Sequence, residues 1–165
     1  MRPRPLLAAF SLLASISMAQ AATPNVEVNY IQPDKFRDAS LRGDGYERGA
    51  DEYVMKQLRS YLQSLGTRYL QPGQTLRIDI RDIDLAGRYE PWHMNANSVR
   101  FMRDITWPSI DLHYSLQQQG SVLKEADARV DDKFYLSRPG RMGTSDNLFA
   151  EKAMLKDWFR DLLKP

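Results

Sequence analysis

The clearest strand of this chain reads Leu76-Arg77-Ile78-Asp79-Ile80-Arg81, in which apolar and charged residues alternate strictly. A period of two is typical of a β-strand that buries one face. The next apolar residues, Ile83 and Leu85, fall out of phase with this alternation. The slip predicts a β-bulge near Arg81-Asp82 or the end of the strand.

Three further strands are predicted around this one. Val26, Val28 and Tyr30 alternate with polar residues and indicate a first strand near the start of the chain. Apolar residues alternate again at Ile110–Leu116 and at Val122–Val130, and Gly120 lies in the polar stretch between them. This pattern is typical of a β-hairpin.

Two segments have the period of an amphipathic helix. The first begins near Ala50 and places Val54, Leu58, Tyr61, Leu62 and Leu65 on one stripe, and Gly66 is expected to end it. The second closes the chain, and its apolar face comprises Leu148, Leu155, Trp158, Phe159 and Leu162. Asp146 and Glu151 lie near its start, as the helix dipole prefers.

The predicted order is therefore β-α-β-β-β-α. We expect an α+β fold with a mainly antiparallel four-stranded sheet and two helices packed on one face. If the first helix connects two parallel strands, the long connections at 32–49, 86–106 and 132–145 fall on one rim of the sheet. Long connections of this kind are uncommon unless they are functional or disordered, so we expect function at that rim.

The predicted rim is rich in arginine and aromatic residues, which suit recognition of an anion, a glycan or a protein partner. The ligand-binding candidates are Arg88, Trp92, Arg100, Arg103, Trp107, Arg138 and Arg141. In the alternative interpretation, the aromatic residues pack the loops down and the arginines pair with neighbouring acids. Those acids are Asp34, Asp38, Asp44, Glu47, Glu90, Asp104 and Asp132.

Carboxylates offer a second candidate site. Asp82 and Asp84 lie two residues apart at a strand end, and Asp104 and Asp111 are possible neighbours. Such a cluster suits a carboxylate- or metal-dependent hydrolase, but the sequence around it lacks the spacing of a calcium loop. His93 and His113 have no serine or cysteine nucleophile in a recognisable motif, and the chain contains no cysteine. We therefore predict no catalytic residue, no metal and no cofactor.

The first 21 residues are typical of a secretory signal peptide. Arg2 and Arg4 precede an apolar run over 6–19, and Ala19-Gln20-Ala21 fits a cleavage site. The run is shorter than the ~20 residues that span a bilayer, so we expect cleavage rather than a membrane anchor. Cleavage after Ala21 would leave a single domain over 22–165 with 21 basic and 21 acidic residues. This balance gives no support to nucleic-acid binding.

Three separated blocks of the sequence occur in a recognisable order. They are Asp82-Ile83-Asp84-Leu85-Ala86-Gly87, then Arg103-Asp104-Ile105-Thr106-Trp107-Pro108 ahead of Ile110, and Glu151-Lys152 ahead of Leu155 and Trp158-Phe159. Together they resemble the bacterial domain of unknown function 3016 family, and the resemblance covers about Val26 to Leu163. It implies a small exported protein of Gram-negative bacteria, hence periplasmic, with no established activity and no catalytic residue to carry over.

The preferred hypothesis is a non-catalytic binding or adaptor module of the cell envelope that uses the arginine and aromatic rim. Its expected partner is an envelope protein or an anionic or glycan ligand. The alternative is a hydrolase of an envelope glycan or phosphate ester, centred on Asp82, Asp84 and Asp104. A third possibility, a structural partner in an envelope complex, would be marked by a large exposed apolar patch.

Overall fold

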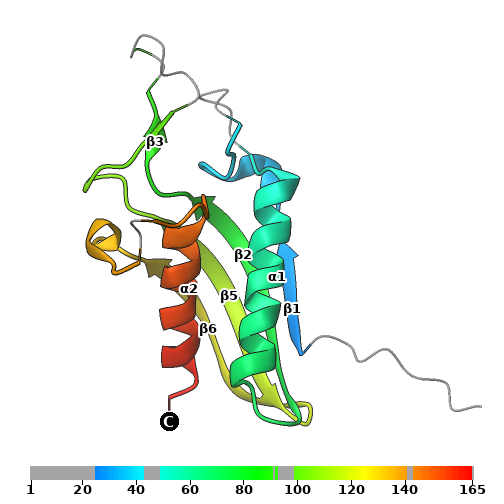
Figure 1. Cartoon of the computed structure of the whole chain (residues 1–165). Coiled ribbons are helices and arrows are strands. Elements are labelled where there is room, and N and C mark those ends of the chain that lie inside the picture. Colours follow the sequence, from blue (N-terminus) through cyan, green and yellow to red (C-terminus); the bar gives the residue numbers. More distant parts are fainter. Residues whose placement is uncertain (1–24, 43–48, 91, 93–98, 141–142, 165) are drawn as a thin grey trace, which may run out of the picture.

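The computed structural model describes residues 25–42, 49–90, 92, 99–140 and 143–164. The predicted signal peptide therefore lies outside the described residues. Two helices pack on one face of a four-stranded sheet (Figure 1). The elements are β1 (Val26–Tyr30), η1 (Pro33–Lys35), α1 (Glu52–Tyr69), β2 (Gln74–Asp84), β3 (Arg88–Tyr89), β4 (Arg100–Phe101), β5 (Ser109–Gln118), β6 (Ser121–Asp131), η2 (Tyr135–Ser137) and α2 (Phe149–Leu162).

The sheet has the strand order β1-β2-β5-β6, and the predicted α+β class is confirmed. β1 and β2 run parallel, whereas β2 with β5 and β5 with β6 are antiparallel. The predicted β-bulge is also confirmed, because the register between β2 and β5 shifts between Ile80 and Asp82. This shift returns Ile83 to the helix-covered face, where it is fully buried.

The core lies between the sheet and the two helices, and it consists of the alternating apolar residues of the strands and the stripes of the helices. Its fully buried members include Val26, Leu58, Ile78, Ile80, Leu155 and Phe159. The opposite face of the sheet carries polar and charged side chains. Among the described residues, no helix has the length and apolar character needed to cross a membrane.

The prediction that Gly66 ends the first helix is wrong, because α1 continues to Tyr69. Gly66 is buried inside the helix at its contact with β1. A Cβ atom at this position would lie 2.2 Å from Val26 Cγ2 and 2.9 Å from Asn25 Oδ1. The glycine is therefore explained by the close approach of the helix to the strand and not by a helix end.

The segment 86–106 shows no period in the sequence, but the structure contains a short two-stranded ladder there. Arg88 pairs with Phe101 and Tyr89 with Arg100. Two residues on each strand are too few to produce a recognisable alternation. The ladder projects beyond the end of β2 (Figure 1).

Candidate functional site

The three long connections meet at one edge of the sheet, as predicted. The parallel β1 and β2 end at this edge, and the antiparallel register places Ser109 of β5 opposite both Asp84 and Asp131. The connections after β1, after β2 and after β6 therefore leave from the same edge. The short turns before β2 and between β5 and β6 lie at the other end (Figure 1). We call the long-loop edge the rim.

The carboxylates of Asp82 and Asp84 at the end of β2 are both bonded to arginine. Arg37 Nη2 contacts Asp82 Oδ2 at 2.6 Å, and its Nη1 contacts Asp84 Oδ2 at 3.2 Å. The second oxygen of Asp84 lies 2.6 Å from Arg88 Nη2. Burial raises the pKa of the Asp84 carboxyl, and the charges of Arg88 and Arg37 oppose that rise.

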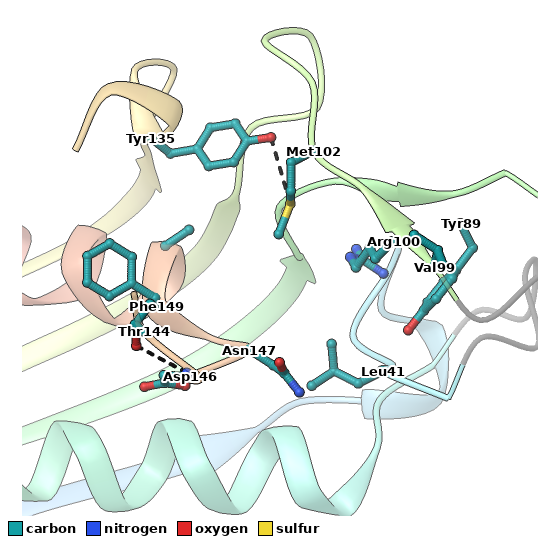
Figure 2. A pocket seen from close by; sticks show the side chains of 11 residues that line it. Leu41, Tyr89, Val99, Arg100, Met102, Tyr135, Thr144, Asp146, Asn147 and Phe149 are labelled. Carbon is teal, nitrogen blue, oxygen red and sulfur yellow. Dashed lines mark hydrogen bonds between the residues drawn. The ribbon is translucent and has the colours of Figure 1, made fainter. Parts of the chain in front are cut away.

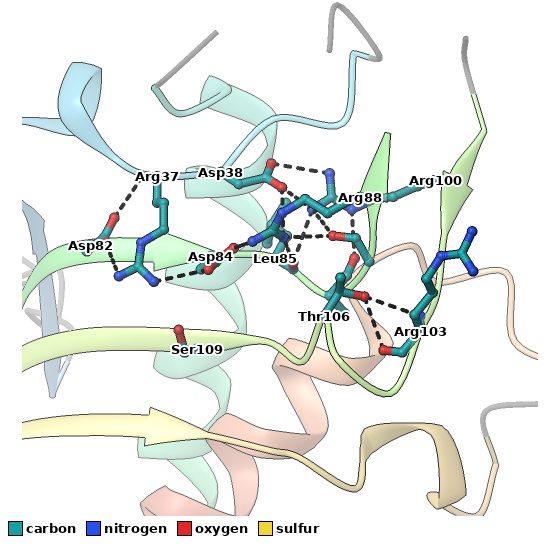
Figure 3. A network of polar contacts seen from close by, with 12 residues as sticks. Arg37, Asp38, Asp82, Asp84, Leu85, Arg88, Arg100, Arg103, Thr106 and Ser109 are labelled. Carbon is teal, nitrogen blue, oxygen red and sulfur yellow. Dashed lines mark hydrogen bonds and ion pairs between the residues drawn. The ribbon is translucent and has the colours of Figure 1, made fainter. Parts of the chain in front are cut away.

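These contacts do not favour the hydrolase hypothesis, which needs Asp82, Asp84 and Asp104 free for chemistry. The first two are engaged by arginines (Figure 3). Asp104 is exposed in the turn after β4. Within the described part of the chain, no group of three His, Cys, Asp or Glu residues is placed to hold a metal ion.

Arg100 is the central residue of the rim network. Its side chain is only 9% exposed, and its guanidinium contacts Asp38 Oδ2 at 2.6 Å. The same group donates to the main-chain carbonyls of Ala86 at 2.7 Å and of Leu85 and Gly87 at 3.1 Å. Arg100 therefore fastens the ladder of β3 and β4 to the end of β2, where the main chain has left the sheet (Figure 3).

Asp38 joins the first connection to this network. Its carboxylate accepts hydrogen bonds from the guanidinium groups of Arg88, at 3.1 Å, and Arg100, at 2.6 Å. Its main chain continues the parallel pairing of β1, because Asp38 N–H donates to Ile83 O and Asp38 O accepts Leu85 N–H. Asp38 thus pairs with two of the predicted binding arginines, one of which, Arg88, also pairs with Asp84.

Gly87 closes the sequence block that begins at Asp82, and two features require glycine here. Its φ is +77°, and a Cβ atom would lie 2.6 Å from the carbonyl oxygen of Phe101. Its N–H donates to Thr106 O at 2.9 Å. The first two blocks of the family resemblance are therefore adjacent in space and hold each other in place.

Two other predicted binding arginines, Arg103 and Arg138, are also paired. Arg103 makes two contacts of 2.7 Å with the buried carboxylate of Glu90. Arg138 bonds Asp132 and also contacts Asp157 at 2.6 Å. Arg141 lies outside the described residues. These pairs favour the interpretation in which the arginines hold the loops, and the ligand-binding role of the candidates stays a prediction.

The two tryptophan candidates differ in environment. Trp107 is half-buried and packs against the small cluster of Ala86, Tyr135 and Ala150. Lys133 Nζ lies over its ring, 5.4 Å from the ring centroid. Trp92 is 67% exposed. Of the two, Trp92 is the one whose ring is accessible to a partner.

A pocket of about 500 Å³ opens at the rim between β4, the segment before α2 and the first turn of α2 (Figure 2). Its lining is mixed, with aromatic and aliphatic groups beside a few polar ones. The lining residues are Leu41, Tyr89, Val99, Arg100, Met102, Tyr135, Thr144, Asp146, Asn147, Phe149 and Ala150. Of the ligand-binding candidates that the structure describes, only Arg100 lines it.

Sequence reasoning missed most of this pocket because its walls come from separate segments that share no local motif. Val99, Met102, Asn147 and Phe149 are ordinary loop and helix residues in the sequence. The only usable signal was topological, namely the convergence of the long connections. That signal located the rim but not the residues.

Glu151 is buried beneath the rim and was also missed. It is 1% exposed, and its Oε1 accepts the N–H of Ala86 at 2.7 Å. Its Oε2 has no hydrogen-bond partner among the described residues. Burial raises the pKa of this carboxyl above its usual range, while the N–H of Ala86 and the charge of Arg100 act in the opposite direction.

The fold and the rim define a two-layer α+β protein whose long connections form a pocket at one edge of its sheet. The family model described as "Protein of unknown function (DUF3016)" matches residues 24–161, and the chain belongs to this family. The resemblance inferred from the sequence blocks is thereby confirmed. No curated protein and no solved structure matches the chain.

Proposed function

We propose that this protein is an exported, non-catalytic binding or adaptor module of the cell envelope, and that the rim pocket receives its partner. The observation that carries the proposal is the position of the pocket, which lies where the three long connections converge. Binding sites concentrate on loops that a rigid scaffold positions.

The lining favours a protein partner that inserts an apolar side chain. Arg100 is neutralised by Asp38, and Asp146 is engaged by Lys152 Nζ at 2.8 Å and by the N–H of Leu148 at 3.0 Å. An anionic ligand would therefore meet little uncompensated positive charge. Tyr89, Met102 and Phe149 offer an apolar surface instead, and Asn147 and Thr144 offer hydrogen bonds at its border.

Export is part of the same proposal. Residues 1–21 would be removed as a signal peptide, and residues 22–165 would form one domain in the periplasm. Fractionation of the producing cells, followed by N-terminal sequencing of the purified protein, tests this step. We expect a periplasmic protein that begins at Ala22, and a cytoplasmic protein that begins at Met1 would refute it.

Site-specific photocrosslinking tests the pocket. A photoreactive amino acid is placed at Asn147 in the lining or, as a control, at Ser60, which is exposed on α1 outside the pocket. We expect a discrete crosslinked product from Asn147 and none from Ser60. Identical products from both positions would overturn the proposal.

A second variant separates pocket binding from general adhesion. Thr144→Trp places a large side chain in the lining and should abolish the Asn147 product, whereas Thr144→Ser keeps the hydroxyl that accepts the N–H of Asp146 and should preserve it. Circular dichroism confirms that both variants are folded. A product that survives Thr144→Trp would place the partner elsewhere.

A further inference from the structure

The outer edge of β6 is a long unpaired edge of the four-stranded sheet. β6 is eleven residues long, and it pairs with β5 on one side only. It is exposed over nearly all of its length. The opposite edge strand, β1, has only five residues. A long exposed edge is a ready template for another strand.

Natural edge strands are often protected by charged side chains, but those of β6 are bonded inward. Lys124 Nζ donates to the main-chain carbonyls of Leu162 at 3.2 Å and of Lys164 at 2.6 Å, beyond the end of α2. Glu125 contacts His113 Nε2 at 3.1 Å on the neighbouring strand. Neither side chain therefore covers the unpaired edge of β6.

The next two charged residues are engaged in the same way. Asp127 contacts His113 Nδ1 at 2.7 Å and Arg81 Nη1 at 3.0 Å. Arg129 contacts Asp111 at 3.1 Å and Ser109 Oγ at 3.0 Å. The stretch 124–131 contains no proline, and the register shift of the β5–β6 pair lies outside it, between Leu116 and Gln117. Two of the usual protections of an edge strand, a proline and a bulge, are thus missing from this stretch.

We propose that β6 pairs with β6 of a second copy of this chain, antiparallel, about a two-fold axis that passes through Asp127 perpendicular to the sheet. The two four-stranded sheets then form one continuous sheet of eight strands. Because the axis is perpendicular to the sheet, the helices of both copies cover the same face. The antiparallel arrangement directs the two rim pockets toward opposite ends of the joined sheet, which suits an adaptor.

Charge complementarity selects this register. With the axis at Asp127, Glu125 lies opposite Arg129 of the second copy, and this pair occurs twice. With the axis at Ala126, Glu125 would lie opposite Asp127, and this like-charge pair would occur twice. With the axis at Ala128, two Asp127–Arg129 pairs would be offset by two like-charge pairs of Glu125 with Asp131. Neither alternative has the excess of opposite-charge pairs that the axis at Asp127 gives.

The chosen register has one like-charge contact, between the two Asp127 residues on the axis. Each Asp127 carboxylate already contacts Arg81 and His113 of its own chain, which compensate its charge. On the helix-covered face, Ala126 lies opposite Ala128 of the second copy. These small residues place no bulky side chain between the two edge strands at this point.

The absence of cysteine from the sequence makes a register-specific test possible. Ala126→Cys and Ala128→Cys are prepared separately and then mixed under mild oxidation. Directly opposite residues of an antiparallel pair have Cα atoms about 4.5–5.5 Å apart, within the range of a disulfide. Neither alanine carries a charge that the interface uses, and gel electrophoresis without reductant separates the products.

We expect a disulfide-linked dimer from the mixture and none from either variant alone, because identical positions are then diagonal neighbours about 7–8 Å apart. Analytical ultracentrifugation of the wild-type protein should show a dimer. Crosslinking of Ala126→Cys alone or Ala128→Cys alone would establish another register and overturn the proposal. A wild-type monomer, or a dimer that none of the samples crosslinks, would overturn it as well.

The rim experiment and this one fail independently. Asn147 and Thr144 lie in the lining of the rim pocket, whereas Ala126 and Ala128 lie on the edge strand. A monomeric protein that still gives the Asn147 crosslink would refute the dimer and leave the proposed function intact.

Discussion

The guanidinium of Arg100 meets the carboxylate of Asp38 at 2.6 Å, although 62 residues separate them in the sequence. Through its other contacts Arg100 also satisfies three consecutive carbonyls at the end of β2. A single side chain thus joins the connection after β1, the end of β2 and the ladder of β3 and β4. The rim depends on this network for its shape.

Replacing Arg100 with methionine should destabilise the protein. Asp38 would lose its closest cation, and the carbonyls of Leu85, Ala86 and Gly87 would lose a donor in a poorly hydrated place. We expect a loss of about 3 kcal/mol in the free energy of unfolding, measured by urea denaturation.

Arg77→Met is the matched control for this prediction. Arg77 is exposed on the open face of the sheet and contacts Asp79 at 3.3 Å. Exposed pairs of this kind contribute about 0–1 kcal/mol. If both variants lost the same small amount of unfolding free energy, the contacts of Arg100 would not stabilise the protein more than an exposed ion pair does.

Glu151 should make stability depend on pH. Burial raises the pKa of its carboxyl in the folded protein, so the folded state binds the proton more tightly than the unfolded chain. The stabilisation from Glu151 is therefore complete below the ordinary glutamate pKa of about 4.3. It is lost as the pH rises through the raised folded value.

Glu151→Gln tests this relationship, because glutamine keeps an oxygen that can accept the N–H of Ala86 but cannot ionise. The stability of the wild-type protein relative to this variant should fall as the pH rises from about 4 toward neutrality. Urea denaturation at a series of pH values measures the difference. A difference that stays constant with pH would contradict the prediction.

The arrangement of the sheet was predictable, whereas the rim contacts were not. The alternation from Leu76 to Arg81 and its slip at Asp82 are local, since each residue's side of the strand follows from its neighbours. The pairs Arg100–Asp38 and Glu151–Ala86 join positions 62 and 65 residues apart. No periodicity links such positions, so sequence reasoning identified the charged residues but not their partners.

Gly66 shows the same limit for a single residue. A glycine near the end of an apolar stripe is typical of a helix end. The alternative, close packing against another element, depends on where β1 lies. The two explanations are distinguished only in the folded structure, where Val26 of β1 packs against Gly66 and the helix continues beyond it.

Gly66→Ala should therefore destabilise the protein, contrary to the usual gain of about 0.5–1 kcal/mol for this change inside a helix. The new methyl group would overlap with Cγ2 of the fully buried Val26. Overpacking of this kind costs about 1–3 kcal/mol. Thermal or urea unfolding of the variant gives the sign directly.

The double variant Gly66→Ala with Val26→Ala shows whether the clash is the cause. Removing the Val26 methyl groups should make Gly66→Ala less damaging than it is in the wild-type background, which a double-mutant cycle detects as a coupling energy. Additive effects of the two changes would mean that the methyl group is accommodated in another way.

His113 should titrate above its ordinary pKa of about 6.5. Hydrogen bonds to Asp127 and Glu125 favour its charged form and raise the pKa. The stabilisation from these contacts is present below the unfolded pKa and is lost as the pH rises through the higher folded value. An NMR titration of the His113 ring protons measures this pKa.

Because the hydrogen bond to Asp127 is the larger cause of the raised pKa of His113, Asp127→Asn should lower that pKa more than Glu125→Gln does. The reverse order would assign the principal partner of His113 to Glu125.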